Sequence, residues 1–237
     1  MNIPIKGFIQ NSMLDWEGKI SSIVFFPNCN MKCFYCHAAT LVCNPDRLEN
    51  ISVDDILKSL KERKKWIDGV VLLGGEPTLY NNLSEFIKKI KDIGLKVKLD
   101  TNGTNPEMVK KLIDEKLIDC VSMDIKAPLD KKKYDKISLV DTPLEKIKKT
   151  INILINSNID YEFRTTISKQ WLSCEDIFEI AKSIKGAKKY IIQKFRYVDG
   201  EILNPEKIDK AYKDYSDSEL KEIAKQIKEK WVDCVVR

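Results

Sequence analysis

Short apolar runs alternate with longer amphipathic segments along almost the whole chain. The apolar runs predict strands, and the amphipathic segments, with apolar residues three and four positions apart, predict helices. Such alternation is typical of a parallel sheet covered by helices. We expect strands at 21–26, 69–75, 96–103 (running into a turn), 120–126, 161–167 and 189–195, helices at 52–67, 83–93, 106–116, 142–157, 174–186 and 216–231, and a possible last strand at 232–237.

About six strand-then-helix units result. Right-handed crossovers would curl six units into an open barrel, so we expect an α/β fold, a partial (β/α)6 barrel with outer helices. Local signals agree with the helix ends. Ser52 can cap the first helix with Asp55 three residues later, Gly94 can end the second, and Pro106 can start the third.

Polar residues and glycines follow each predicted strand. In order they are a cysteine-rich loop and the stretches GGEP, LDTNG, MDIK, RTT and QKF. The carboxyl ends of parallel strands meet at one edge of a sheet or barrel, where the chemistry of such folds is found. We therefore expect a functional site along this rim.

The loop after the first strand, FFPNCNMKCFYCHAAT, holds Cys29, Cys33 and Cys36 in a C-x3-C-x2-C spacing. A structural zinc site needs four ligands on one ion, and only Cys43 or His37 could complete it. His37 directly follows a cysteine, which makes joint ligation awkward, and a second C-x2-C pair is absent. A four-iron cluster held by three thiolates, with one iron open to a ligand, fits the spacing better.

The other cysteines, Cys43, Cys120, Cys174 and Cys234, are scattered, as small buried apolar residues often are. An odd total of seven, clustered at one end, argues against a disulfide framework. We therefore expect a reducing, cytoplasmic environment.

Composition limits the partners. The net charge of +5 is mild, and the lysines recur beside acids on predicted helices, which indicates solvated faces and no dedicated nucleic-acid surface. No apolar run approaches the length of a membrane helix, and the N-terminus lacks the pattern of a signal peptide.

Taken in order, the stretches FFPNCNMKCFYCH, LLGGEPTLY, KLDTNGTNPEMV, SMDIKAP and YEFRTTI followed by QKF resemble the radical S-adenosylmethionine (SAM) family. Within it they resemble the activating enzymes of glycyl radical enzymes, most of all the activator of anaerobic (class III) ribonucleoside-triphosphate reductase. The resemblance covers nearly all of residues 5–205.

The resemblance implies two cofactors, one [4Fe-4S] cluster on the three cysteines and SAM, whose methionyl group would chelate the open iron. It implies reductive cleavage of SAM to a 5′-deoxyadenosyl radical, which takes hydrogen from a glycine of a partner enzyme. The implied partners are class III ribonucleotide reductase and an external electron donor such as flavodoxin or ferredoxin.

The resemblance also implies SAM contacts, each of which has a simpler structural alternative. Glycines and Asn-Gly pairs form turns, and Asp124 with Lys126 can be a plain salt bridge. Arg164 lies in an apolar strand, where an unpaired charge is costly, so we expect a carboxylate partner from the protein or from SAM. The residues expected to bind the cofactors are Tyr35, Cys36, His37, Gly74, Gly75, Glu76, Asp100, Asn102, Asp124, Lys126, Arg164 and Gln193.

We expect one radical SAM domain over residues 1–237, with a core at about 19–200 and a C-terminal helical extension at about 204–237. Two other functions stay open. A radical SAM enzyme acting on a small molecule, such as a 7-deazapurine precursor, would carry the same cysteines. A non-catalytic metal-binding module is disfavoured by GGEP and by the strand–helix alternation.

Overall fold

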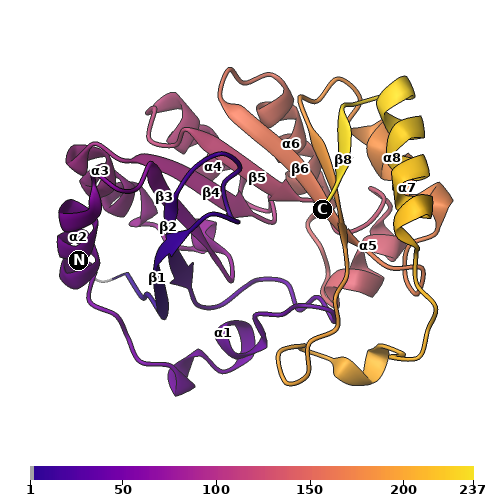
Figure 1. Ribbon diagram of the computed structural model, residues 1–237, viewed down its shortest axis with the longest axis horizontal. Helices are drawn as coiled ribbons and strands as arrows, with labels where there is room; N and C mark the ends of the chain where they lie inside the picture. The colour runs from indigo at the N-terminus through magenta and orange to yellow at the C-terminus, as the bar shows by residue number, and fades with distance from the viewer. Residues whose placement is uncertain (1–2) are drawn as a thin grey trace. The chain divides into compact units, whose positions relative to one another are not determined.

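The computed structural model describes residues 3–237 and shows an α/β fold with a mostly parallel sheet (Figure 1). Its strand order follows the sequence from β1 to β8, which leaves β1 and β8 as edges of an open sheet. β1 is antiparallel to β2, whereas the pairs β2–β3, β3–β4, β6–β7 and β7–β8 are parallel. The strands are β1 Gly7–Ser12, β2 Ser21–Phe26, β3 Gly69–Gly74, β4 Lys96–Thr101, β5 Cys120–Asp124, β6 Asp160–Ile167, β7 Tyr190–Lys194 and β8 Cys234–Val236.

Several helices begin or end at residues that cap helix termini well. The Ser52 hydroxyl accepts a hydrogen bond from the Asp55 amide, and Gly94 ends its helix with a left-handed φ of 92°. Both predicted boundaries are thus confirmed. The helices are α1 Ala39–Cys43, α2 Val53–Arg63, α3 Leu83–Ile93, α4 Pro106–Asp114, α5 Lys131–Ser138, α6 Leu144–Ile155, α7 Cys174–Ser183 and α8 Asp217–Lys230.

Some elements differ from the sequence prediction. β1 and α5 were not predicted, because β1 is a half-exposed edge strand and α5 is short and rich in lysine. α2 ends at Arg63 and not at residue 67, since the next residues turn back with the Trp66 amide bonded to the Arg63 carbonyl.

By their internal contacts the residues form two compact units. Unit 1 contains the chain up to Asn30 together with Ala38–Thr101 and Asn105–Val121. Unit 2 contains Met31–His37, Asn102–Thr104 and Ser122–Arg237. Each unit is described on its own below.

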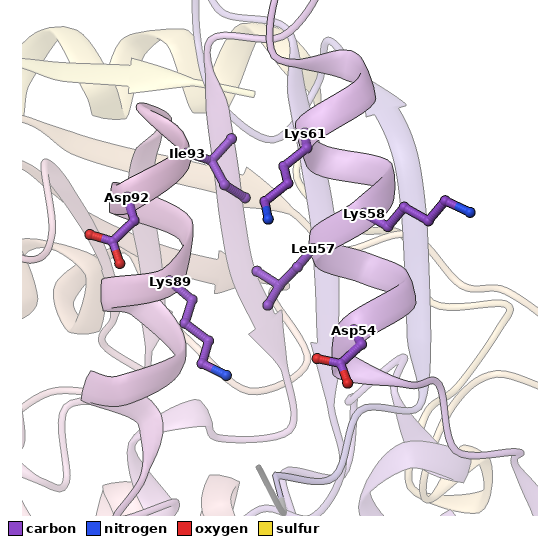
Figure 2. A pocket seen from close by; sticks show the side chains of 7 residues that line it. All are labelled: Asp54, Leu57, Lys58, Lys61, Lys89, Asp92 and Ile93. Carbon is purple, nitrogen blue, oxygen red and sulfur yellow. The ribbon is translucent and has the colours of Figure 1, made fainter.

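In unit 1, the apolar strands β2, β3 and β4 run in parallel register, with Phe26 opposite Gly74. Helices α2 and α3 lie against each other, and side chains of both line a pocket of about 560 Å³ (Figure 2). The Leu57, Lys61 and Ile93 side chains extend into this space, and the Lys58 side chain extends away from it. None of the pocket's lining residues is a predicted site residue, and lysines alternate there with Asp54 and Asp92.

In unit 2, β6, β7 and β8 are in parallel register, and α7 and α8 contact each other. Its largest fully buried side chains include Tyr134, Phe163 and Tyr190. Within residues 3–237 of both units, no helix is long and apolar enough to cross a lipid bilayer.

Candidate active site

The cysteine-rich loop directly follows β2. Cys29 belongs to unit 1, where the preceding Asn28 has a left-handed φ of 59° and its amide donates to the Leu41 carbonyl over 2.8 Å. Cys33 and Cys36 belong to unit 2 and close one turn, because the Cys36 amide donates to the Cys33 carbonyl over 3.0 Å. None of the three cysteines is in a disulfide bond.

Two distant segments of unit 2 hold this loop through its backbone. The Lys32 amide donates to the Ser138 carbonyl at the end of α5 over 2.8 Å. The Leu203 amide donates to the Cys36 carbonyl over 3.0 Å. The last carbonyls of a helix have no partner within the helix, so the first bond also satisfies the C-terminus of α5. The loop that carries Cys33 and Cys36 is therefore fixed by protein on both sides.

Aromatic rings fix the same loop through its side chains. The Tyr35 ring stacks on Trp171, with 5.2 Å between centroids and 12° between planes. Phe34 contacts both rings edge to face, and Phe195 contacts Tyr35 and Trp171 in the same way. We call Phe34, Tyr35, Trp171 and Phe195 the aromatic cluster. Such contacts add to the stability gained by burial and fix ring orientation.

His37, the only histidine of the sequence, is exposed, but two contacts fix its ring. Its ring stacks on Phe195 at 5.5 Å, and its Nε2 lies 2.8 Å from the Arg196 carbonyl oxygen. Because a carbonyl oxygen only accepts, Nε2 must carry the proton and donate it.

The glycines of GGEP, in unit 1, lie against the start of the cysteine-rich loop. The Gly75 amide donates to the Phe26 carbonyl over 2.8 Å, and a Cβ added at Gly75 would lie 1.7 Å from the Asn28 carbonyl oxygen. Gly74 has a φ of 119°, and a Cβ added there would lie 2.5 Å from the Phe26 carbonyl oxygen. Only glycine allows this approach, so both residues have a packing role beside the predicted cofactor contact.

Glu76 is buried with 1% of its surface exposed. Its Oε1 accepts hydrogen bonds from the Thr78 amide at 3.1 Å, the Thr78 hydroxyl at 2.5 Å and the Thr101 hydroxyl at 2.8 Å. These bonds hold the carboxylate at the carboxyl ends of β3 and β4.

The DTNG stretch is divided between the units. Asp100, in unit 1, forms an ion pair with the buried Lys98 at 3.2 Å. In unit 2, the Asn102 side-chain oxygen accepts from the Thr104 amide and hydroxyl, which shapes the turn. Gly103 has a φ of 76°, which favours glycine, and a Cβ added there would lie 2.1 Å from Met123 Cε.

Asp124, Lys126 and Arg164 form one charged group in unit 2, which we call the Asp124 trio. Arg164 Nε donates to Asp124 Oδ1 and Lys126 Nζ donates to Asp124 Oδ2, both over 2.9 Å. The three side chains are only 13–28% exposed. The expected carboxylate partner of Arg164 is thus confirmed, and it is Asp124.

The charges of the trio control its protonation. Burial by itself would raise the pKa of Asp124, but the charges and hydrogen bonds of Arg164 and Lys126 outweigh it and hold that pKa well below its usual value. Burial by itself would lower the pKa of Lys126, but the Asp124 carboxylate outweighs it and raises that pKa. All three groups are therefore charged at neutral pH, and the trio has a net charge of one positive.

Tyr35 is buried, and the charges of this trio act on its hydroxyl. Burial raises the pKa of Tyr35, and the positive charge of Lys126 opposes that rise. Gln193, also in unit 2, is half-buried in β7 opposite Thr166. The predicted site residues are divided between the two units. Unit 1 contains Cys29, Gly74, Gly75, Glu76 and Asp100. Unit 2 contains Cys33, Tyr35, Cys36, His37, Asn102, Asp124, Lys126, Arg164 and Gln193.

Sequence reasoning missed Trp171 and Tyr134. Trp171 lies in the loop after β6, and the Tyr134 hydroxyl accepts a hydrogen bond from the Lys126 amide over 3.1 Å. Neither residue belongs to a recognisable motif. Only their place in the sequence could have indicated them, because each follows a strand whose carboxyl end was expected at the rim.

The donor set suits an iron–sulfur cluster. Cys29, Cys33 and Cys36 are all reduced and lie within eight residues of the sequence. Thiolates are the ligands that iron–sulfur clusters take, and each one binds a different iron of a four-iron cluster.

The family model for the radical SAM superfamily matches residues 23–169, from β2 to the end of β6. The chain belongs to the radical SAM superfamily. It is therefore a member of an enzyme family whose cofactors are a [4Fe-4S] cluster and SAM, as the cysteine loop predicted.

Two relatives from Methanocaldococcus jannaschii are named as glycyl-radical enzyme activating enzymes. The first is 34% identical over 242 residues, covering 100% of this chain and 96% of the relative. The second is 31% identical over 177 residues, covering 73% of this chain and 64% of the relative. A protein of Methanococcus maripaludis named as a GTP 3′,8-cyclase is 34% identical over 127 residues, but this covers only 53% of this chain and 41% of that protein.

Solved structures support the fold. Streptococcus suis SuiB bound to SAM has a TM-score of 0.68 at 17% identity, over 91% of this chain and 51% of SuiB. A radical SAM methyltransferase from Sphaerobacter thermophilus also has a TM-score of 0.68, at 12% identity, over 99% of this chain and 77% of that one. The predicted α/β architecture of the radical SAM type is thus confirmed.

Proposed function

We propose that this protein activates a glycyl radical enzyme by cleaving SAM reductively and removing a hydrogen atom from a glycine of its partner. The main support is the similarity over the whole chain to a relative named as a glycyl-radical enzyme activating enzyme. The D-T-N-G and D-x-K stretches of the sequence also favour this function over a small-molecule reaction.

Cys29, Cys33 and Cys36 would hold the [4Fe-4S] cluster. Together, the bound cofactors supply a 5′-deoxyadenosyl radical. The protein's task is to bind, orient and exclude solvent. The backbone bonds and the aromatic cluster fix Cys33 and Cys36 before any cluster is inserted, which reduces the conformational entropy lost on binding.

The Asp124 trio would bind the charged methionyl group of SAM. Its two cationic side chains, Lys126 and Arg164, are donors of the kind that form charge-assisted hydrogen bonds with a carboxylate. For the remaining predicted contacts, Gly74, Gly75 and Glu76 would bind the aminopropyl part of SAM. Asp100, Asn102, His37 and Gln193 are proposed as further contacts of the cofactor.

As the specific partner we propose class III ribonucleotide reductase, with flavodoxin or ferredoxin as the electron donor. The support for this choice is the overall likeness of the sequence motifs. A primary carbon radical attacks whatever lies nearest, so a glycine loop from the partner would both supply the hydrogen and exclude solvent.

The second candidate is a radical SAM enzyme that acts on a small molecule. The partial similarity to GTP 3′,8-cyclases favours it, but it covers only about half of this chain. A small-molecule enzyme would turn over SAM fully with its metabolite and would need no protein partner.

Anaerobic reconstitution tests the proposal. We expect about four iron and four sulfide per chain, slow SAM cleavage by the reduced protein alone, and faster formation of 5′-deoxyadenosine with the partner. A doublet-type glycyl radical signal should appear on the partner in electron paramagnetic resonance. One zinc and no sulfide would refute the radical function altogether, and full turnover with a metabolite alone would favour the second candidate.

A further inference from the structure

Tyr80 lies shortly after the GGEP stretch, and the site described above assigns it no role. Its hydroxyl donates a hydrogen bond to the Pro27 carbonyl over 2.7 Å and accepts one from the Asn28 side-chain amide over 3.3 Å. A phenol hydroxyl can make both bonds, because its oxygen donates one hydrogen and also accepts. Tyr80 therefore binds the two residues that directly precede Cys29 in the sequence.

Asn28 has an uncommon backbone conformation, with a left-handed φ of 59°. Asparagine tolerates this region better than most residues, but the region is still less favourable than the helical or extended ones. The Asn28 amide donates to the Leu41 carbonyl, and the Asn28 carbonyl accepts from the Glu76 amide, each over 2.8 Å. Together with the side-chain bond to Tyr80, these bonds fix the direction in which the backbone enters Cys29.

Packing fixes the ring of Tyr80 as well. Its centroid lies 5.7 Å from that of the fully buried Phe26, with 34° between the ring planes. The Tyr80 amide donates to the Pro77 carbonyl over 3.2 Å, which closes the short turn after GGEP. The Tyr80 hydroxyl is thus a fixed group in unit 1, to which the start of the cysteine-rich loop is bonded.

We propose that Tyr80 is a positioning residue for Cys29 and acts through Pro27 and Asn28. We call the two hydrogen bonds of the Tyr80 hydroxyl the Tyr80 lock; they hold the Cys29 thiolate where it binds its iron. This inference rests on the proposed function, because it needs Cys29 as a cluster ligand. Loss of the lock should affect Cys29 alone, since the turn of Cys33 and Cys36 is held by backbone bonds and aromatic contacts within unit 2.

Alkylation of the cluster-free protein by iodoacetamide tests the lock at one cysteine. Trypsin cuts after Lys32, so peptide 20–32 contains Cys29 alone, and peptide 33–47 contains the next three cysteines. Cys29 is half-buried, so its reaction becomes faster when the surrounding structure opens. Tyr80→Phe removes two hydrogen bonds and keeps the ring, so it should raise the alkylation rate of peptide 20–32 about 3- to 10-fold. The rate for peptide 33–47 should stay within about 2-fold.

The cluster-loaded protein gives a second measurement. Iron passes to a chelator only when a thiolate leaves its iron, so Tyr80→Phe should release iron about 3- to 10-fold faster than the wild type. The electron paramagnetic resonance lines of the reduced cluster should broaden, because Cys29 takes more than one position. Tyr161→Phe is the matched control in unit 2, since its hydroxyl accepts from the Lys188 amide over 3.2 Å. It should keep the wild-type lines and release iron within about 2-fold of the wild-type rate.

Asn28→Gly tests whether the side chain and the hydroxyl act together. Glycine adopts the left-handed φ without strain, so this variant loses the bond to Tyr80 and keeps the backbone conformation. It should raise the alkylation rate of Cys29 about 2- to 5-fold, and it also serves if Tyr80→Phe does not fold. The double variant should stay within about 2-fold of Tyr80→Phe, because both changes break the same lock.

The contrary outcomes are distinct. An unchanged alkylation rate of Cys29 in Tyr80→Phe would show that the hydroxyl does not position it. An equal rise for both peptides, or equally fast iron release by Tyr161→Phe, would mean a general loss of stability and overturn the proposal. Effects that multiply in the double variant would show that Asn28 and Tyr80 act separately. A wild type that takes up no iron and sulfide would refute the proposed function itself, whatever the alkylation rates.

Discussion

Gly75 offers a sharp test of how the cysteine-rich loop is supported. An alanine Cβ at this position would lie 1.7 Å from the Asn28 carbonyl oxygen and 2.5 Å from its carbon. Ordinary van der Waals contact begins near 3.4 Å, so the two segments must separate by about 1.7 Å. Because Asn28 directly precedes Cys29, this separation displaces the first cysteine.

The cost follows from the bonds that are broken. The Gly75 amide bonds to the Phe26 carbonyl and the Glu76 amide bonds to the Asn28 carbonyl, each over 2.8 Å. Each bond contributes about 1 kcal/mol, and overpacking costs about 1–3 kcal/mol more. We expect Gly75→Ala to lower the free energy of unfolding by about 2–4 kcal/mol, allowing for partial relaxation.

Urea unfolding of the cluster-free protein, followed by circular dichroism, measures this loss. Gly94→Ala is a matched control, because a Cβ added at Gly94 would meet no atom of a non-neighbouring residue within 4 Å, although the φ of 92° is left-handed. It should cost only about 1 kcal/mol from backbone strain. After reconstitution, Gly75→Ala should hold less iron than Gly94→Ala. Equal stability and equal iron in the two variants would refute the close-contact explanation.

Three further predictions concern cysteines and charges. Replacing any one cysteine of the C-x3-C-x2-C motif by alanine should abolish SAM cleavage with loss of the cluster spectrum, whereas Cys174→Ala should stay within a few-fold; equal loss at Cys174 would mean a wrong ligand assignment. Asp124→Asn should lower the free energy of unfolding of the cluster-free protein by about 2–3 kcal/mol at pH 7, because Lys126 and Arg164 lose their counter-charge. The folded pKa of Asp124 is depressed, so its contribution is complete above the unfolded pKa of about 3.9 and is lost as the pH falls through the folded pKa. The wild-type and Asp124→Asn stability curves should therefore converge below about pH 4, and parallel curves would contradict this. Lys126→Ala should weaken SAM binding while the visible spectrum of the cluster is retained; loss of the cluster with normal SAM binding would be inconsistent with its role.

Much of the fold was predictable because the local signals agree with one another. β2, β3 and β7 contain short apolar runs, and β4 alternates polar with apolar residues. Ser52, Gly94 and Pro106 mark helix ends by their own backbone chemistry. β1 was missed because its sequence lacks the alternation of apolar and polar residues that predicts a strand. As an edge strand it forms only by pairing with β2, and this pairing depends on tertiary contacts.

The site was predictable in its motifs but not in its contacts. A buried charge predicts a partner, so the carboxylate beside Arg164 could be foreseen, whereas its identity as Asp124 required the structure. A glycine predicts close approach without saying to what. At Gly75 the neighbour is the Asn28 backbone, and a direct contact with SAM stays a prediction. Trp171, 136 positions from Tyr35, could be found only by folding the chain.

The central claim is that a partner's glycine supplies the hydrogen atom. The most direct test is a partner enzyme deuterated at the Cα of its glycines, incubated anaerobically with the reduced, cluster-loaded protein and SAM. We predict that deuterium appears in 5′-deoxyadenosine, analysed by mass spectrometry, as the glycyl radical signal rises on the partner. If deuterium from the partner never enters 5′-deoxyadenosine, and deuterium from a small metabolite does, the protein is a small-molecule radical SAM enzyme and not an activating enzyme.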